Sequence, residues 1–157
     1  MMRVAFIDTS VLDNVVPVPG RDQDRETVEI GLKDRVERGV RLVLPVTAVI
    51  ETGNHVAQVK DGRARRTTAE RFVRLLELVR DGKAPWQFNP AAWSEDYWDA
   101  LLRGASTGQT LLDLLCQQMG TGDLAIIAER DKYVAASGLP SDSVEVWTLD
   151  GLLAAQG

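Results

Sequence analysis

The feature that most constrains the fold is a short apolar run that ends in a carboxylate. Val4 to Ile7 contains no polar side chain, and Asp8 follows it directly. A strand without polar residues is buried on both faces, as the central strands of parallel sheets are. An acid at the carboxyl end of such a strand lies where open α/β sheets bind their ligands. The run therefore predicts an α/β fold with a functional site at that edge.

Strand and helix patterns alternate along the rest of the chain. Further strands are predicted at 40–44, 86–88 and 144–148. Helices are predicted at about 9–15, 21–38, 65–80, 111–119 and 150–155, with others capped by Thr47, capped by Ser94 and opened by Asp123. The Asp61-Gly62 pair is expected to end the helix that Thr47 begins, and Gly120-Thr121-Gly122 is expected to form a turn. This alternation predicts a three-layer α/β/α domain over residues 1–157, around a mostly parallel central sheet.

Composition narrows the class of protein. Hydrophobic residues make up 45% of the chain and charged residues 26%, which is ordinary for a globular protein. No apolar run reaches the roughly 20 residues that a membrane helix needs, and Asp8 interrupts the first one, so we expect a cytoplasmic protein without a secretory leader. Cys116 is the single cysteine, which excludes a disulfide, and its leucine-rich surroundings predict that it is buried. The net charge of -5 argues against binding nucleic acid over the whole surface, without excluding a nucleic-acid enzyme.

Four acids follow or flank the predicted strands. They are Asp8, Glu51, Asp123 and Asp150. Strand ends and the starts of the following helices share one edge of a parallel sheet, so folding can gather all four there. Clustered carboxylates suit Mg²⁺ or Mn²⁺, which bind oxygen ligands, activate water and stabilise charge on phosphoryl groups. The set predicts a metal-dependent phosphodiester hydrolase.

Each acid also has a purely structural interpretation. Asp123 can act as a helix cap, Asp150 as a turn residue and Glu51 as part of a solvated helix face. Asp113 competes with Asp123 for the third place, although it lies within a leucine-rich helix and lacks the Gly-Asp opening. Asp13, one turn beyond Ser10, is expected to be solvated. The metal hypothesis depends on the four acids as a set.

The same residues resemble the motifs of PIN-domain nucleases. The segment 6–12, Phe-Ile-Asp-Thr-Ser-Val-Leu, is similar to the opening motif of that family, and Glu51 resembles its second acid. Gly122-Asp123 with the apolar residues after it is similar to the motif of the third acid. The segment 147–150, Trp-Thr-Leu-Asp, resembles the Thr-x-Asp segment that ends the pattern. The motifs occur in the family order over nearly the whole chain.

This resemblance implies an activity and a set of partners. It implies a Mg²⁺- or Mn²⁺-dependent endoribonuclease, often the toxin of a toxin–antitoxin pair as in VapC-type toxin ribonucleases, and usually a homodimer. Asp8, Glu51, Asp123 and Asp150 would form the acidic, catalytic and metal-binding site. Ser10 and Thr148 would support it by hydrogen bonding. The implied partners are RNA and a protein antitoxin.

Several other residues are candidates for substrate contacts. His55 is four residues after Glu51 and so shares its helix face, where it either binds a substrate phosphate, supports Glu51, or is simply a partly exposed helix residue. Asn54 has the same alternatives. Arg63 and Arg66 belong to an arginine-rich segment that either contacts RNA phosphates or forms a solvated face. The sequence assigns no role to the tryptophan-rich segment 83–108.

Two rival functions remain to be compared with the nuclease. A haloacid-dehalogenase-type phosphatase also has an aspartate after its first strand, but it needs a second acid two residues later, where this chain has Ser10. A non-catalytic PIN-like module that binds RNA or protein is the other alternative, and the complete acid set argues against it. Metal binding discriminates between the nuclease and this module.

Overall fold

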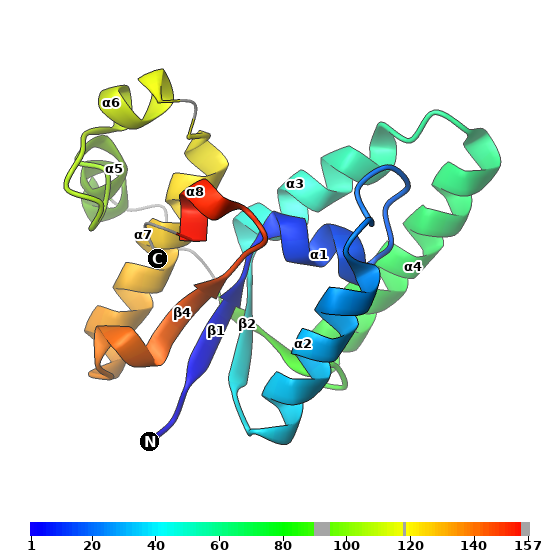
Figure 1. The fold of residues 1–157 in the computed structure, drawn as a ribbon, viewed down its shortest axis with the longest axis horizontal. Coiled ribbons are helices and arrows are strands. Elements are labelled where there is room, and N and C mark those ends of the chain that lie inside the picture. Colours follow the sequence, from blue (N-terminus) through cyan, green and yellow to red (C-terminus); the bar gives the residue numbers. More distant parts are fainter. Residues whose placement is uncertain (90–94, 118, 155–157) are drawn as a thin grey trace.

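The protein folds as a parallel sheet flanked by helices (Figure 1). The computed structural model describes residues 1–89, 95–117 and 119–154. The strands are β1 (Val4–Ile7), β2 (Arg41–Pro45), β3 (Trp86–Asn89) and β4 (Val144–Trp147). The helices are α1 (Thr9–Val15), α2 (Arg25–Glu37), α3 (Val46–Ala57), α4 (Gly62–Arg80), α5 (Glu95–Leu102), α6 (Leu111–Cys116), α7 (Thr121–Ser137) and α8 (Gly151–Ala154), with a 3₁₀ turn at Ser141–Ser143.

The sheet has the strand order β3-β2-β1-β4, and every pair of neighbouring strands is parallel. β1 lies between β2 and β4, and all four of its residues are buried. Its odd-numbered side chains, Ala5 and Ile7, belong to the largest core, whereas Val4 and Phe6 belong to a smaller one. The apolar run at the start of the chain is therefore a central strand covered on both faces, as predicted.

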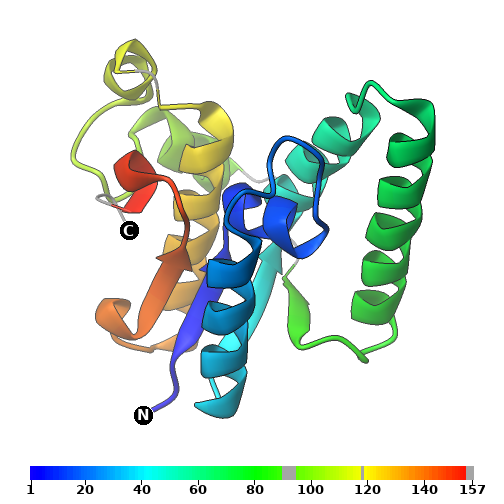
Figure 2. The same cartoon turned by 45° about the vertical axis from the view of Figure 1, so that its right-hand side comes forward.

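Helices pack on both faces of this sheet (Figures 1 and 2). On one face, Val28 of α2 and the apolar face of α4 pack into the larger core. On the other face, Tyr133 of α7 meets Phe6 edge to face, with ring centroids 5.4 Å apart. A separate cluster joins α5 and α6 to α7 through Tyr97 and Leu114. The carboxyl ends of the strands are thereby left between α3, α7 and α8.

The last strand is held against α2 by a close approach. A Cβ on Gly31 would lie 2.9 Å from Cζ2 of Trp147, so glycine lets the indole ring pack against the helix backbone. The guanidinium group of Arg35 lies 3.9 Å from the centre of the same ring and also pairs with Glu145 at 2.9 Å. This packing positions Trp147 and so the segment that carries Thr148 and Asp150.

Several predicted helix boundaries were wrong for identifiable reasons. The helix predicted at 21–38 begins at Arg25, and α3 begins at Val46 after Pro45 rather than behind a Thr47 cap. Asp61 does not end α3: it caps α4, because its carboxylate accepts the backbone N–H of Ala64 at 2.8 Å. Gly122 lies in the first turn of α7, which begins at Thr121, so Gly120-Thr121-Gly122 is not a separate turn.

Helix α6 also differs from its prediction. It ends at Cys116 rather than at residue 119, and the Cys116 side chain is exposed instead of buried. Leucine richness misled the prediction because α6 directs only part of its surface inward: Leu114 is buried, whereas Leu112 is 70% exposed. The expected cap at Ser94 lies outside the described residues. Within the described part of the chain, no helix has both the length and the apolar character that crossing a membrane requires.

Candidate acidic site at the carboxyl edge of the sheet

Asp8 sits at the junction of β1 and α1, where one of its two oxygens is firmly held. Its Oδ2 atom accepts hydrogen bonds from the hydroxyl of Ser10 and the hydroxyl of Thr148, both at 2.7 Å, and from the Ser10 backbone N–H at 3.3 Å. The carboxylate is 2% exposed. Three donors on one oxygen fix the orientation of the carboxylate.

The two hydroxyl residues also connect the first and last strands. The Ser10 hydroxyl accepts the backbone N–H of Leu149 at 3.0 Å, and the Thr148 hydroxyl accepts that of Asp150 at 2.9 Å. The backbone N–H of Asp8 donates to the carbonyl of Trp147 at 3.0 Å. Ser10 and Thr148 thus do more than support Asp8, because they fasten the segment after β4 to the segment after β1.

Two carboxylate oxygens at this edge are buried without a partner. They are Oδ1 of Asp8 and Oε1 of Glu51, neither of which has a hydrogen-bond partner among the described residues. A buried, unpartnered carboxylate oxygen is costly, so such atoms in a native fold require an explanation. Burial raises the pKa of Glu51, and the negative charges of Asp8 and Asp13 raise it further.

Gly122 explains how Glu51 approaches α7. A Cβ placed on Gly122 would lie 1.9 Å from Oε1 of Glu51 and 2.7 Å from its carboxyl carbon. A side chain at position 122 would therefore displace the Glu51 carboxylate. The sequence interpretation assigned Gly122 to a turn and missed this role, although its position directly before Asp123 was the available signal.

Asp123 lies in the first turn of α7 and faces the other acids. Burial and then the charges of Asp8, Asp150 and Glu51 raise its pKa to about 7, against a weaker opposing effect from its hydrogen bond with the Gly120 backbone. The N-cap position of α7 belongs to Gly120, so Asp123 is not merely the cap of its helix. Asp8, Glu51 and Asp150 therefore lie near enough to Asp123 for their charges to act on it.

Asp150 has a structural role as well. Its Oδ1 atom accepts the backbone N–H of Leu153 at 3.2 Å, and its carbonyl accepts that of Ala154 at 2.9 Å. Asp150 is therefore the residue that caps α8, which begins at Gly151 rather than at residue 150. Its charge acts on Asp123, so capping and membership of the acidic site occur together.

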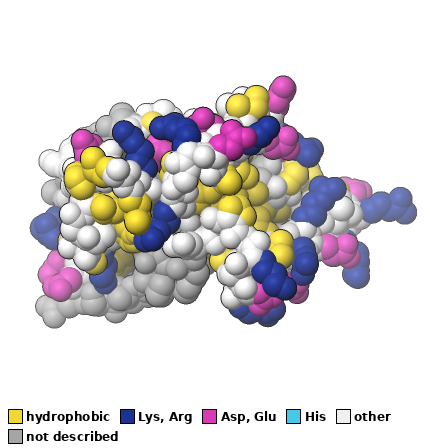
Figure 3. All heavy atoms as spheres, turned by 90° about the horizontal axis from the view of Figure 1, so that it is seen from below, with side chains coloured by type: hydrophobic (Ala, Val, Ile, Leu, Met, Phe, Trp, Pro, Cys, Tyr) yellow, Lys and Arg dark blue, Asp and Glu magenta, His cyan; other side chains and the backbone are white. Residues whose placement is uncertain are grey.

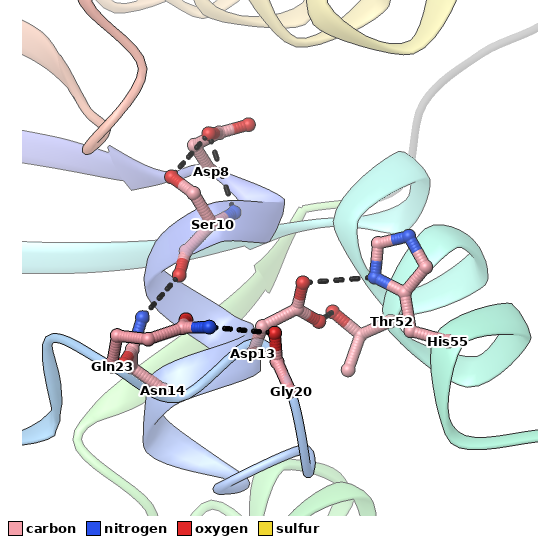
Figure 4. A network of polar contacts seen from close by, with 8 residues as sticks. All are labelled: Asp8, Ser10, Asp13, Asn14, Gly20, Gln23, Thr52 and His55. Atoms are coloured by element: carbon pink, nitrogen blue, oxygen red, sulfur yellow. Dashed lines mark hydrogen bonds and ion pairs between the residues drawn. The ribbon is translucent and has the colours of Figure 1, made fainter. Parts of the chain in front are cut away.

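A second polar cluster lies beside the acids, between α1 and α3 (Figure 4). Asp13, expected to be solvated, is only 3% exposed and accepts hydrogen bonds from Thr52 at 3.0 Å and from Nδ1 of His55 at 2.8 Å. Burial raises the pKa of Asp13, and the charge of His55 and the Thr52 hydroxyl partly offset that effect. The prediction for Asp13 failed because both of its partners come from α3, which local sequence cannot reveal. His55 supports Asp13 rather than Glu51.

The remaining candidates lie at different distances from this edge. Asn54 is exposed on α3, one turn after Glu51. Arg63 and Arg66 are exposed near the start of α4, on the other side of α3 from α7 (Figures 1 and 2), and Arg66 pairs with Glu70 at 3.1 Å. Asp113 is exposed on α6, and its charge is not among those that raise the pKa of Asp123. The structure therefore separates the arginines and Asp113 from the four acids.

Charge is distributed differently at the opposite end of the molecule. Figure 3 looks toward the amino ends of the strands, where basic and acidic side chains are interspersed over the described surface. The arginines of α4 share this pattern, because Arg74 pairs with Glu77 and Arg80 with Asp81. No face of one sign is visible in this view, whereas the carboxyl edge gathers four acids.

The acidic edge has the chemistry that a hard divalent cation requires. All four candidate ligands are carboxylates, two of their oxygens are buried without partners, and the pKa of Asp123 is raised by burial and then by the neighbouring negative charges. Among the described residues, no three His, Cys, Asp or Glu side chains are yet arranged around one point as the ligands of a metal ion would be.

No family model, no curated protein and no solved structure matches this chain.

Proposed function

We propose that this protein is a metal-dependent endoribonuclease with a PIN-like, three-layer α/β/α domain. One observation carries the proposal: the unpartnered buried oxygens of Asp8 and Glu51 lie beside Asp123, whose pKa is raised to about 7. The four-stranded parallel sheet with the order β3-β2-β1-β4 is consistent with it. Asp8, Glu51, Asp123 and Asp150 are the proposed ligands of Mg²⁺ or Mn²⁺.

The roles of the protein's own groups follow from their contacts. Bound Mg²⁺ or Mn²⁺ supplies an activated water and stabilises charge on the phosphodiester. Ser10 and Thr148 hold Oδ2 of Asp8, so Oδ1 would be the oxygen of this carboxylate that binds a cation. Gly122 leaves space for the Glu51 carboxylate, which would be a second ligand. Asp123 takes part in its ionised form, which a cation favours by neutralising the charges of its neighbours.

The proposal extends to the biological setting that the resemblance implies. It includes a cytoplasmic location, a homodimer, and a protein antitoxin as partner. Light scattering of the purified protein tests the dimer, and co-purification with the product of an adjacent small gene tests the antitoxin.

The variant Asp8→Asn tests the proposed reaction. Asparagine keeps an oxygen that accepts from Ser10 and Thr148, but it removes the negative charge. We expect cleavage of a fluorescent single-stranded RNA in Mn²⁺ to fall by roughly 10²- to 10³-fold, since the metal contributes several kcal/mol of transition-state stabilisation. The matched control is Asp113→Asn, an exposed carboxylate outside the acidic edge, which should cleave like the wild type.

Two results would refute the nuclease proposal. One is equal cleavage by the wild type and Asp8→Asn, and the other is cleavage that persists in EDTA. A non-catalytic PIN-like module is the second candidate, and it is favoured by the finding that no three acidic or histidine side chains of the described chain already share a ligand position. Calorimetric titration separates the two candidates, because only the nuclease should bind Mn²⁺.

A further inference from the structure

The cluster of Asp13, Thr52 and His55 fixes a histidine ring beside the acidic edge. Both oxygens of the buried Asp13 carboxylate are occupied, Oδ1 by the Thr52 hydroxyl at 3.0 Å and Oδ2 by Nδ1 of His55 at 2.8 Å. The carboxylate sits on α1 and both partners sit on α3. Asp13 is thus a rigid support that sets the orientation of the His55 ring relative to α1.

The orientation leaves the second ring nitrogen available. When Asp13 is ionised, its carboxylate only accepts hydrogen bonds, and Nδ1 then carries the hydrogen that points to Asp13. Figure 4 shows the other ring nitrogen, Nε2, pointing away from Asp13, and no described residue forms a hydrogen bond with it. The His55 side chain is 19% exposed, so the ring is held in place and still accessible.

The position of His55 relates it to the acids. His55 follows Glu51 by four residues on α3, so it lies on the same helix face, about 6 Å farther along the axis. The Glu51 carboxylate lies against Gly122 of α7. An RNA strand with one phosphate at the acids that runs along α3 therefore brings its next phosphate near His55.

We propose that His55 binds the phosphate next to the scissile one in a single-stranded RNA, and that Asp13 positions its ring for this contact. This inference rests on the proposed nuclease function. In the complex the imidazolium ring donates Nδ1–H to Asp13 and Nε2–H to a phosphate oxygen. A cationic donor at this place offsets the repulsion between the acidic edge and the RNA backbone, which the distant Arg63 and Arg66 do not do.

Two substitutions of His55 test the roles of its two ring nitrogens separately. The amide of His55→Asn lies where Nδ1 was, so it can keep the contact with Asp13 but cannot reach the phosphate. The longer His55→Gln places its amide near the position of Nε2. We expect His55→Asn to weaken binding of a short fluorescein-labelled single-stranded RNA in EDTA by about tenfold, the value of one hydrogen bond to a charged group, and His55→Gln to bind within about threefold of the wild type.

A chemically altered RNA completes the test. A methylphosphonate placed at successive positions removes one phosphate charge at a time. At one position the wild type should lose about tenfold in affinity, whereas His55→Asn should lose little there, because its partner is already absent. Equal midpoints of thermal unfolding in the variants and the wild type show that the fold is retained. If His55→Asn does not fold, the methylphosphonate series with His55→Gln and the wild type is the test.

The outcomes distinguish this inference from the function on which it rests. Wild-type affinity in His55→Asn, equal losses in both variants, or a wild type that is insensitive to every methylphosphonate would overturn it. Because binding is measured without metal, failure of Mn²⁺-dependent cleavage refutes the nuclease alone. Normal cleavage with unchanged affinity in His55→Asn refutes the phosphate contact alone.

Discussion

Removing the charge of Asp123 should stabilise the metal-free protein, although it damages the proposed site. The pKa of this carboxyl is raised from 3.8 to about 7, first by burial and then by Asp8, Asp150 and Glu51. The folded protein therefore holds a proton that the unfolded chain releases near pH 4. Stability is lost as the pH rises from about 4 through about 7, and the loss is complete above that range.

The magnitude follows from the same values. A pKa of about 7 in the folded state and 3.8 in the unfolded state corresponds to about 4 kcal/mol of lost stability at about pH 8. Asp123 is partly exposed, so solvent screening reduces this to about 2 kcal/mol. Asp123→Asn carries no charge and should unfold roughly 4–8 °C above the wild type at about pH 8. At about pH 5 the difference should fall below about 1 kcal/mol.

Thermal unfolding followed by circular dichroism in EDTA measures this difference. The matched control is Asp113→Asn on α6, which removes an exposed carboxylate without relieving the acidic edge. Adding Mn²⁺ should reverse the order, because the wild type gains more from the cation than the variant does. The reasoning is refuted if Asp123→Asn is no more stable than the wild type at about pH 8, or if its advantage is the same at both pH values.

Two further substitutions test how the site is held together. Gly122→Ala should abolish Mn²⁺-dependent RNA cleavage while circular dichroism shows an intact fold, because the new Cβ would collide with Oε1 of Glu51. Gly62→Ala is the control, since position 62 has space for a methyl group. Equal activity of the two variants would contradict this role of Gly122. Thr148→Val should lower the free energy of unfolding, measured in urea, by about 1–3 kcal/mol, because Asp8 loses a buried hydroxyl donor. Thr148→Ser keeps a hydroxyl and should retain most of the wild-type stability. Unchanged stability of Thr148→Val would contradict this role of Thr148.

The sequence predicted the sheet and one helix well because their signals are local. The run at 4–7 coincides with β1, the run at 40–44 overlaps β2 with a shift of one residue, and α1 spans Thr9–Val15 as predicted. The parallel arrangement of the sheet also followed from the alternation of strands and helices. Among the predicted elements, the largest errors lay at helix ends, where one motif can either end a helix or begin the next. Asp61-Gly62 was interpreted as a stop, but the same aspartate is a good cap for the next helix.

The acidic site was less accessible to sequence reasoning. The four acids could be named because Asp8, Asp123 and Asp150 lie at strand ends or in the first turn of a helix, and Glu51 lies in the helix after β2. Their electrostatic coupling, the close approach of Gly122 to Glu51 and the burial of Asp13 all depend on contacts between α1, α3 and α7. Such contacts form between residues far apart in the chain, and no local pattern encodes them.

The hydrogen bond between Thr148 and Asp8 has a consequence for the order of events in folding. It joins residues 140 positions apart, and the pairing of β4 with β1 spans the same interval. Closing so long a loop is entropically expensive, so we expect this contact to form after the local helices and the β1–β2 pair. During synthesis, Asp8 therefore lacks the hydrogen bond from the Thr148 hydroxyl until nearly the whole chain has been made. A protein built in this way completes its acidic edge last, when the rest of the fold is already in place.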